Sequence, residues 1–293
     1  MEDTIQIAIV GLGVIGGSFA WALKEQEDFP VKLMGIDRDG RTLDQALAAG
    51  VIDRGELANR EILQQADLVI ITLYPDDLVA FVKDHRDSFK AGAIVTDVTG
   101  VKGRVVEEVV AILPEEVDFI FGHPMVGRES QGFAYADKTV FDQANYLLTP
   151  RPANKPENVH FLTQLLTALG FKSVRQVDYQ THDRMVAYVS QLCHILAISL
   201  INSDQAGQET ADFMGDSYRD LTRIANINAP LWQQLFLHNK EALLRAMANF
   251  QDQFDLLKKA LEDEDKASLM ALLEEGAKRR LALEKMDFKV QNN

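Results

Sequence analysis

The sequence is short of cysteine, of positive charge and of long apolar runs, and each shortage excludes a class of protein. Cys193 is the single cysteine among 293 residues, so we expect neither a disulfide framework nor a cysteine-rich zinc site. We expect no bound metal. Thirty Lys and Arg against 44 Asp and Glu give a net charge of −14. This argues against a nucleic-acid partner, because phosphate binding depends on clustered cations.

The usual signals for export and for membrane insertion are also missing. The segment Met1-Glu2-Asp3 stands directly before the first apolar stretch, where a signal peptide would carry positive charge. No apolar run reaches the roughly 18–20 residues that cross a bilayer. With 47% apolar and 25% charged residues, the composition is that of an ordinary globular protein. We expect a cytoplasmic protein with no membrane partner.

The first half alternates short apolar runs with helix-length stretches, which is typical of βαβ units and a mostly parallel sheet. After about residue 180 the pattern changes to helices only. We therefore predict a Rossmann-type α/β domain over residues 1–178 and an all-α domain over residues 179–293. The expected strands are 5–10, 32–36, 68–73, 94–98, 117–121, 146–149 and 173–177, with a helix over about 156–169.

In the second half, large apolar residues recur at gaps of three, four or seven from Leu231 to Leu261. This spacing predicts one long helix with a buried face, with Asn228 as its cap and Pro230 in its first turn. A final helix is expected over about residues 265–286. The apolar faces pack either within the chain or against a second copy of it, and the pattern is compatible with both.

A glycine-rich loop follows the first expected strand and opens a helix. Its sequence is Gly11-Leu12-Gly13-Val14-Ile15-Gly16. In a dinucleotide-binding fold the first glycine permits a tight turn, the second lets backbone amides approach a pyrophosphate, and the third lets helix and strand pack closely. A glycine-rich turn without a ligand is the alternative, but the strand before the loop and the helix after it favour a cofactor site.

Asp37 follows the second expected strand, 21 residues past Gly16. A carboxylate at this place accepts hydrogen bonds from a ribose 2′-hydroxyl and would repel a 2′-phosphate, which favours NAD over NADP. Arg38 either stacks on the adenine or softens that preference. Leu73 and Asp97, at the ends of two further expected strands, complete the expected cofactor site.

Four later segments carry a resemblance to a known family. In this order, and together with the glycine loop, they resemble the prephenate/arogenate dehydrogenases of tyrosine biosynthesis, and the prephenate branch most closely. The resemblance spans nearly the whole chain. The segments are Asp97-Val98-Thr99-Gly100-Val101-Lys102, Gly122-His123-Pro124-Met125-Val126-Gly127, Ser190-Gln191-Leu192-Cys193-His194 and Tyr218-Arg219-Asp220-Leu221-Thr222-Arg223-Ile224-Ala225.

The resemblance implies NAD-dependent oxidative decarboxylation of prephenate to 4-hydroxyphenylpyruvate by a homodimer joined through the helical domain. His123 matches the catalytic histidine, and a neutral imidazole at the end of a parallel strand suits proton removal near pH 7. We expect it to titrate within about one unit of pH 6.5. Arg223 matches the arginine that holds a substrate carboxylate through two parallel hydrogen bonds.

The chain departs from the family pattern at two places in the expected substrate pocket. The family commonly has a serine where this chain has Gly100, and the hydroxyl of Thr99, one residue displaced, is the candidate replacement. Gln191 stands where the family usually has a histidine, while His194 matches a second pocket histidine. Trp232 lies where family members carry a tryptophan.

Other residues admit two interpretations from the sequence. Arg219 lies one helical turn before Arg223 and either lines the same pocket or pairs with Asp216. The adjacent His182 and Asp183 are either a helix start or part of the pocket.

Three other functions compete with the prephenate assignment. The chain could act on arogenate, in which an amino group replaces the side-chain keto group. A different two-domain dehydrogenase, such as a β-hydroxyacid dehydrogenase or an imine reductase, would be expected to carry a lysine motif in the helical domain, and none is recognised here. A catalytically silent NAD-binding sensor would be expected to lack His123 or Arg223, and both are present.

Overall fold

The computed structural model describes residues 4–57, 60–127, 130–205 and 207–291. The segment Met1-Glu2-Asp3, on which the expectation about export signals rests, lies outside them. The chain forms two compact units, Met1–Ala242 and Leu243–Asn293.

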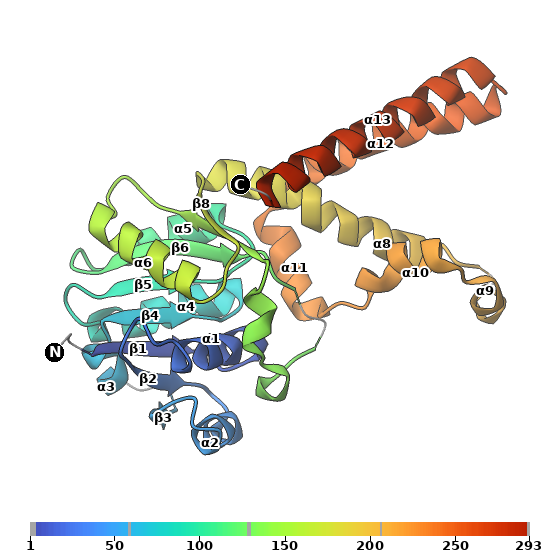
Figure 1. Ribbon diagram of the computed structural model, residues 1–293. Coiled ribbons are helices and arrows are strands. Elements are labelled where there is room, and N and C mark those ends of the chain that lie inside the picture. The colour runs from blue at the N-terminus through green and yellow to red at the C-terminus, as the bar shows by residue number, and fades with distance from the viewer. Residues whose placement is uncertain (1–3, 58–59, 128–129, 206, 292–293) are drawn as a thin grey trace. The chain divides into compact units, whose positions relative to one another are not determined.

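An eight-stranded sheet forms the centre of the first unit (Figure 1). Its order is β3-β2-β1-β4-β5-β6-β7-β8. The first six strands in sequence pair in parallel, whereas β7 runs antiparallel to β6 and parallel to β8. The mostly parallel Rossmann-type sheet is thus confirmed. The strands are β1 (Ile5–Val10), β2 (Val31–Ile36), β3 (Arg54–Glu56), β4 (Leu68–Ile71), β5 (Ile94–Asp97), β6 (Asp118–Pro124), β7 (Asn145–Thr149) and β8 (Ser173–Gln176).

Helices cover both faces of this sheet. Side chains of α1, α2 and α6, such as Phe19, Leu43 and Leu162, belong to one buried cluster. Side chains of α3, α4 and α5, such as Ile62 and Leu78, belong to the other. Because both faces are covered, every residue of β4 and β5 is buried. The helices are α1 (Val14–Lys24), α2 (Gly40–Ala48), α3 (Arg60–Gln65), α4 (Pro75–His85), α5 (Gly103–Val110) and α6 (Pro156–Ala168), with short 3-10 turns at Arg86–Ser88, Phe133–Tyr135 and Lys138–Phe141.

The first unit continues into helices, as predicted from the change of pattern near residue 180. α7 (Tyr179–Val186), a π-helical turn (Ala187–Gln191) and α8 (Leu192–Asn202) form one unbroken helical stretch. α9 (Gln208–Phe213), α10 (Asp216–Thr222), a 3-10 turn (Arg223–Ala225) and α11 (Ala229–His238) follow in this unit.

The stretch Tyr179–Asn202 is long and apolar enough to cross a membrane when judged by length and composition alone. The expectation that no segment reaches that length is therefore wrong on this measure. Three of its polar residues, His182, Asp183 and Gln191, are buried and, as described below, are hydrogen-bonded to other elements of the unit. Core helices of soluble proteins satisfy the same test of length and composition.

The predicted single helix after Leu231 is instead two helices. α11 ends at His238, Asn239 interrupts the helical conformation, and α12 (Lys240–Glu262) follows. α12 and α13 (Lys266–Gln291) run antiparallel as a hairpin in the second unit (Figure 1). The hairpin leaves many apolar side chains exposed, where a buried face was expected. Examples are Phe254, Leu261, Met270, Leu273, Leu281 and Leu283.

Candidate functional site

Three glycines shape the loop between β1 and α1. Gly11 has a φ of +85°, in the left-handed region that favours glycine. A Cβ on Gly16 would lie 1.9 Å from the carbonyl oxygen of Gly11, so a side chain cannot be accommodated there. Gly13 caps the N-terminus of α1, and nothing lies within 4 Å of the place where its side chain would be. The positive end of α1 is thus accessible to an anionic group.

This loop lies at the topological switch point of the sheet, where β1 has β2 on one side and β4 on the other. Open α/β sheets bind ligands at the carboxyl ends of the strands at such a point. Leu12 and Val14 bury their side chains in the core, while Ile15 is half-buried. Leu73 follows β4 and borders the loop, because a Cβ on Gly11 would lie 2.9 Å from its Cδ2.

Asp37 follows β2 and is bonded to the glycine loop. Its Oδ2 accepts a hydrogen bond from the backbone amide of Leu12 at 2.7 Å, and its Oδ1 accepts one from the amide of Asp39 at 2.9 Å. The carboxylate is half-buried, and Arg38 beside it is exposed. A carboxylate beside the loop suits a ribose hydroxyl. The loop and Asp37 therefore fit a dinucleotide.

A buried ion pair holds the segment that follows β5. Lys102 Nζ lies 2.7 Å from Asp97 Oδ2, and both side chains are fully buried. Asp97 Oδ1 accepts a hydrogen bond from the amide of Gly122 at 3.0 Å. Burial lowers the pKa of Lys102, and the negative charge of Asp97 opposes that shift. Asp97 therefore ties the ends of β5 and β6 together, and its contact with a cofactor stays a prediction.

The hydroxyl of Thr99 belongs to the same buried cluster. It bonds to Asp97, lies 3.0 Å from the carbonyl oxygen of Val101, and accepts from Lys102 Nζ at 3.0 Å. A Cβ on Gly100, in contrast, would lie 3.5 Å from His123 Nε2. Position 100 therefore borders the imidazole and carries no hydroxyl. The Thr99 hydroxyl is engaged in the ion-pair cluster, and its contact with a substrate stays a prediction.

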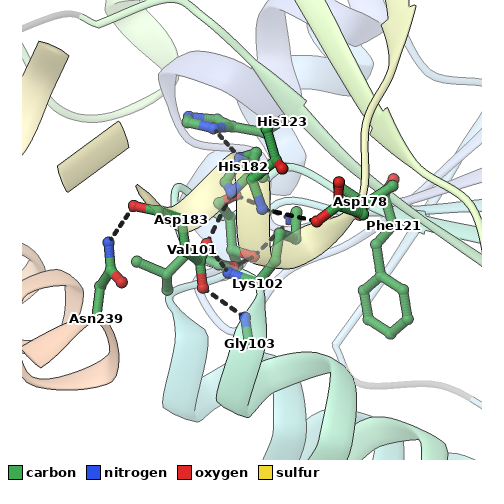
Figure 2. Close-up of polar contacts among 12 residues, drawn as sticks. Val101, Lys102, Gly103, Phe121, His123, Asp178, His182, Asp183 and Asn239 are labelled. Atoms are coloured by element: carbon green, nitrogen blue, oxygen red, sulfur yellow. Dashed lines mark hydrogen bonds and ion pairs between the residues drawn. The ribbon is translucent and has the colours of Figure 1, made fainter. Parts of the chain in front are cut away.

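His123 lies near the carboxyl end of β6 and leads a chain of three polar side chains (Figure 2). Its Nδ1 is 2.9 Å from His182 Nε2, and His182 Nδ1 is 2.7 Å from Asp183 Oδ1. The Asp183 carboxylate also accepts hydrogen bonds from the backbone amides of Lys102 at 2.9 Å and Gly103 at 2.7 Å, where α5 begins. Residues of β6, α7 and α5 are thus joined at one point.

The pKa of His123 lies well below the usual value for histidine. Burial is the main cause, and the neighbouring His182 and Lys102 lower it further. The pKa of His182 is also lowered, first by burial, although Asp183 opposes this shift. Both imidazoles are therefore neutral at pH 7. The expectation of a titration near pH 6.5 used the value of a solvated imidazole, whereas burial shifts the pKa of His123 downward.

A second group of predicted residues gathers where α8, the turn Arg223–Ala225 and α11 meet. The rings of His194 and Trp232 have centroids 3.6 Å apart, and His194 Nδ1 lies 2.9 Å from the carbonyl oxygen of Ser190. Burial lowers the pKa of His194, and the positive charge of Arg223 adds to this effect. The guanidinium of Arg223 is therefore near that imidazole, and the residue is exposed.

Helix α11 links this second group with His123. Trp232 and Leu235 are three residues apart and so lie on one side of the helix. Trp232 packs on His194, while Leu235 Cδ2 would lie 3.3 Å from a Cβ on Gly100, beside His123. The predicted base and the predicted pocket residues therefore border the same helix.

Two predicted substrate contacts have other partners in the structure. Gln191 is buried, and its Nε2 donates to the carbonyl oxygen of Leu235 at 2.9 Å while its Oε1 accepts from Asn239 Nδ2 at 2.9 Å. It therefore joins the π-helical turn to α11. Arg219 Nη1 lies 3.1 Å from Asp216 Oδ1, and both side chains are well exposed. Of the two interpretations of Arg219, the structure has the ion pair.

His182 and Asp183 are site residues that the sequence did not assign. Both side chains are buried in α7, but the exposed polar residues Gln180 and Arg184 lie beside them in the sequence, so the pattern of residues gave little signal. A polar pair on such a helix needs buried partners. Those partners come from β6 and α5, about 60 and 80 residues earlier in the chain.

The fold and the glycine loop define a Rossmann-type nucleotide-binding protein with an appended helical part. Two family models match the chain. The nucleotide-binding domain of prephenate dehydrogenase matches residues 19–175, and its dimerization domain matches residues 178–275. The chain belongs to the prephenate dehydrogenase family, as its sequence resemblance indicated. It is accordingly an oxidoreductase of tyrosine biosynthesis.

Relatives and solved structures agree with this family. The prephenate dehydrogenase of Bacillus subtilis is 31% identical over 274 residues, which cover 92% of this chain and 73% of that protein. A crystal structure of prephenate dehydrogenase from A. aeolicus in complex with hydroxyphenyl propionate and NAD+ has a TM-score of 0.87 at 26% identity, and covers 96% of this chain and 99% of that one. Arogenate dehydrogenase from Synechocystis has a TM-score of 0.82 at 26% identity, and covers 95% and 100%.

Proposed function

We propose that the chain oxidises prephenate with loss of carbon dioxide, giving 4-hydroxyphenylpyruvate and NADH. Two observations support this proposal: the chain belongs to the prephenate dehydrogenase family, and His123 has the geometry of a base. Its Nδ1 is hydrogen-bonded to His182, while its Nε2 faces the space at Gly100, where a Cβ would lie 3.5 Å away. The nitrogen that faces this space is the one that can take a proton from a substrate hydroxyl. The relative from B. subtilis is a prephenate dehydrogenase, which supports this choice of substrate.

The cofactor and two residues would each serve a different step of the reaction. NAD, when bound at the glycine loop beside Asp37, supplies the acceptor for the hydride that leaves the hydroxyl-bearing carbon. His123 Nε2 takes the hydroxyl proton as the carbonyl develops. The ring carboxylate departs as carbon dioxide, and its electron pair completes the aromatic ring, so the protein needs no group to stabilise a carbanion. Arg223 binds a substrate carboxylate and orients the ring.

A second candidate substrate is arogenate, which the related structure from Synechocystis favours. Arogenate carries an amino group where prephenate carries a keto group, and the ring chemistry is the same. The residues of the chain would then serve the same steps, with tyrosine as product.

The domain division and the location belong to the same proposal. We place the boundary between the cofactor domain and the helical domain at residues 178/179. The match to the nucleotide-binding domain ends at residue 175 and the match to the dimerization domain begins at residue 178, which supports this boundary. We also propose a cytoplasmic location.

A direct assay tests the substrate and cofactor together. We expect the absorbance of reduced nicotinamide to appear with prephenate and NAD, and to appear more slowly when arogenate replaces prephenate. It should also appear more slowly when NADP replaces NAD, because Asp37 would repel the 2′-phosphate. NADH formation from arogenate alone would transfer the proposal to the second candidate. Absence of NADH with both substrates, while NAD still binds, would contradict a dehydrogenase and favour an NAD-binding sensor.

Replacing His123 by Asn should reduce kcat by roughly 10²–10⁴, the usual contribution of a positioned acid or base. In the unsubstituted protein, activity should fall only when the pH drops well below 6.5, because burial keeps the pKa of His123 low and the imidazole neutral. A pH profile of kcat/KM measures this limb. Unchanged turnover in His123→Asn, or the same acidic limb in that variant, would contradict the assignment.

Replacing Arg223 by Ala should raise the KM for prephenate roughly 10- to 100-fold, since a hydrogen bond to a charged group contributes about 1.5–3 kcal/mol. The affinity for NAD should stay nearly constant. Arg86→Ala is the control, because this exposed arginine is paired with Asp87 and has no assigned role in the site. Equal weakening of substrate and cofactor by Arg223→Ala would instead indicate damage to the fold.

We propose that two copies of the chain associate through the region matched by the dimerization domain. Light scattering should then give twice the chain mass of 32.8 kDa, about 66 kDa. Phe213, 88% exposed within this region, should be covered by the partner. Phe213→Ser should therefore weaken the dimer, whereas Leu57→Ser, at an exposed position of the cofactor domain, should not. A monomer at micromolar concentration would contradict the proposal.

A further inference from the structure

His182 is a buried histidine that the proposed chemistry does not use directly. Its Nε2 lies 2.9 Å from His123 Nδ1 and its Nδ1 lies 2.7 Å from Asp183 Oδ1. The histidine is almost fully buried and comes from α7, whereas His123 comes from β6. The two imidazoles and the carboxylate are thus joined by two consecutive hydrogen bonds. In each of these bonds, one partner must donate the proton and the other must accept it.

The directions follow from Asp183. Its carboxylate accepts from the backbone amides of Lys102 and Gly103, at the start of α5. An ionised carboxylate only accepts, so His182 Nδ1 must donate to it. His182 is neutral because burial lowers its pKa, and a neutral imidazole carries one proton. Its Nε2 is therefore an acceptor.

The acceptor on His182 fixes the proton of His123. A hydrogen bond to that acceptor requires the proton of the neutral His123 ring to be on Nδ1. Nε2 then carries the lone pair, and it is the nitrogen that borders Gly100. We infer that His182 is a positioning residue: held by Asp183, it selects the tautomer of His123 whose basic nitrogen faces the proposed substrate. This inference rests on the proposed role of His123 as base.

Nuclear magnetic resonance of the protein without substrate tests the tautomer directly. With nitrogen-15 in the histidine rings and His123 assigned through His123→Asn, we expect a protonated Nδ1 and a bare Nε2 at pH 8. His182→Leu removes the acceptor, so the Nε2-protonated form should gain population. His182→Gln, which offers an amide oxygen near the position of Nε2, should restore the first form. A wild-type His123 protonated on Nε2 would overturn the inference.

Kinetics provide the second readout. His182→Leu should lower kcat by about 100-fold, the size of effect that misplacement of a catalytic group produces, with the KM for prephenate nearly unchanged. His182→Gln should recover most of the loss, and His160→Leu, at an exposed histidine of α6, should have no effect. A kcat of His182→Leu within twofold of wild type would overturn the inference.

The two proposals can fail separately. If His123→Asn abolishes turnover while wild-type His123 is protonated on Nε2, the base assignment stands and the role of His182 does not. If the tautomer is as inferred but His123→Asn turns over normally, the proposed function of His123 fails. The wild-type spectrum decides on the tautomer even if His182→Leu does not fold.

Discussion

The geometry around the candidate base depends on the carboxylate of Asp183. This side chain comes from α7 and accepts hydrogen bonds from the backbone amides at the start of α5. The first amide groups of an α-helix have no partner inside the helix and need acceptors from elsewhere. Asp183 on α7 accepts from the amides of Lys102 and Gly103 at the beginning of α5. This contact fixes α7 against the carboxyl end of the sheet. His182, the preceding residue, is thereby held facing His123.

A second buried charge fixes the other side of the same histidine. Burying an ion pair is costly unless hydrogen bonds satisfy its remaining atoms. The pair of Asp97 and Lys102 meets this condition through Thr99 and the amide of Gly122. Gly122 immediately precedes His123, so the backbone of β6 is held by Asp97 while the imidazole is held by His182. The position of the ring is therefore determined from both the sheet and the helical part.

Much of the fold could be predicted because its strands have a strong signal. β1 and β4 are nearly continuous apolar runs, as is typical of strands covered on both faces, and glycine is required at the turn after β1 for steric reasons. β3 (Arg54–Glu56) was missed because it is short, lies at the sheet edge and has no apolar pattern. It forms through backbone pairing with β2, which leaves no trace in side-chain periodicity.

The break between α11 and α12 was missed for a related reason. Asn239 is a tolerable residue within a helix, and the apolar spacing continues past it. Its side chain is buried, however, and donates to the carbonyl oxygen of Asp183 at 2.8 Å and to Gln191 Oε1 at 2.9 Å. We infer that these two tertiary hydrogen bonds contribute more stability than the helical hydrogen bonds that a continuous helix would gain at this position. In the same way, the spacing of residues within α7 gave no indication that His182 would meet His123, since their contact joins positions 59 residues apart.

Gly100 makes the contact between His123 and His182 more important in this chain, because a glycine offers no side-chain hydrogen bond to the imidazole. Where the family pattern has a serine, a Cβ would lie 3.5 Å from His123 Nε2, so a hydroxyl there would stand beside the basic nitrogen. This chain has no side chain at that position, and the hydroxyl of Thr99 is committed to Asp97 and Lys102. Orientation of the imidazole therefore depends on its Nδ1 side, where His182 lies. The absence of a polar side chain at position 100 leaves Nε2 without a competing hydroxyl on that side, as the proposed proton transfer requires.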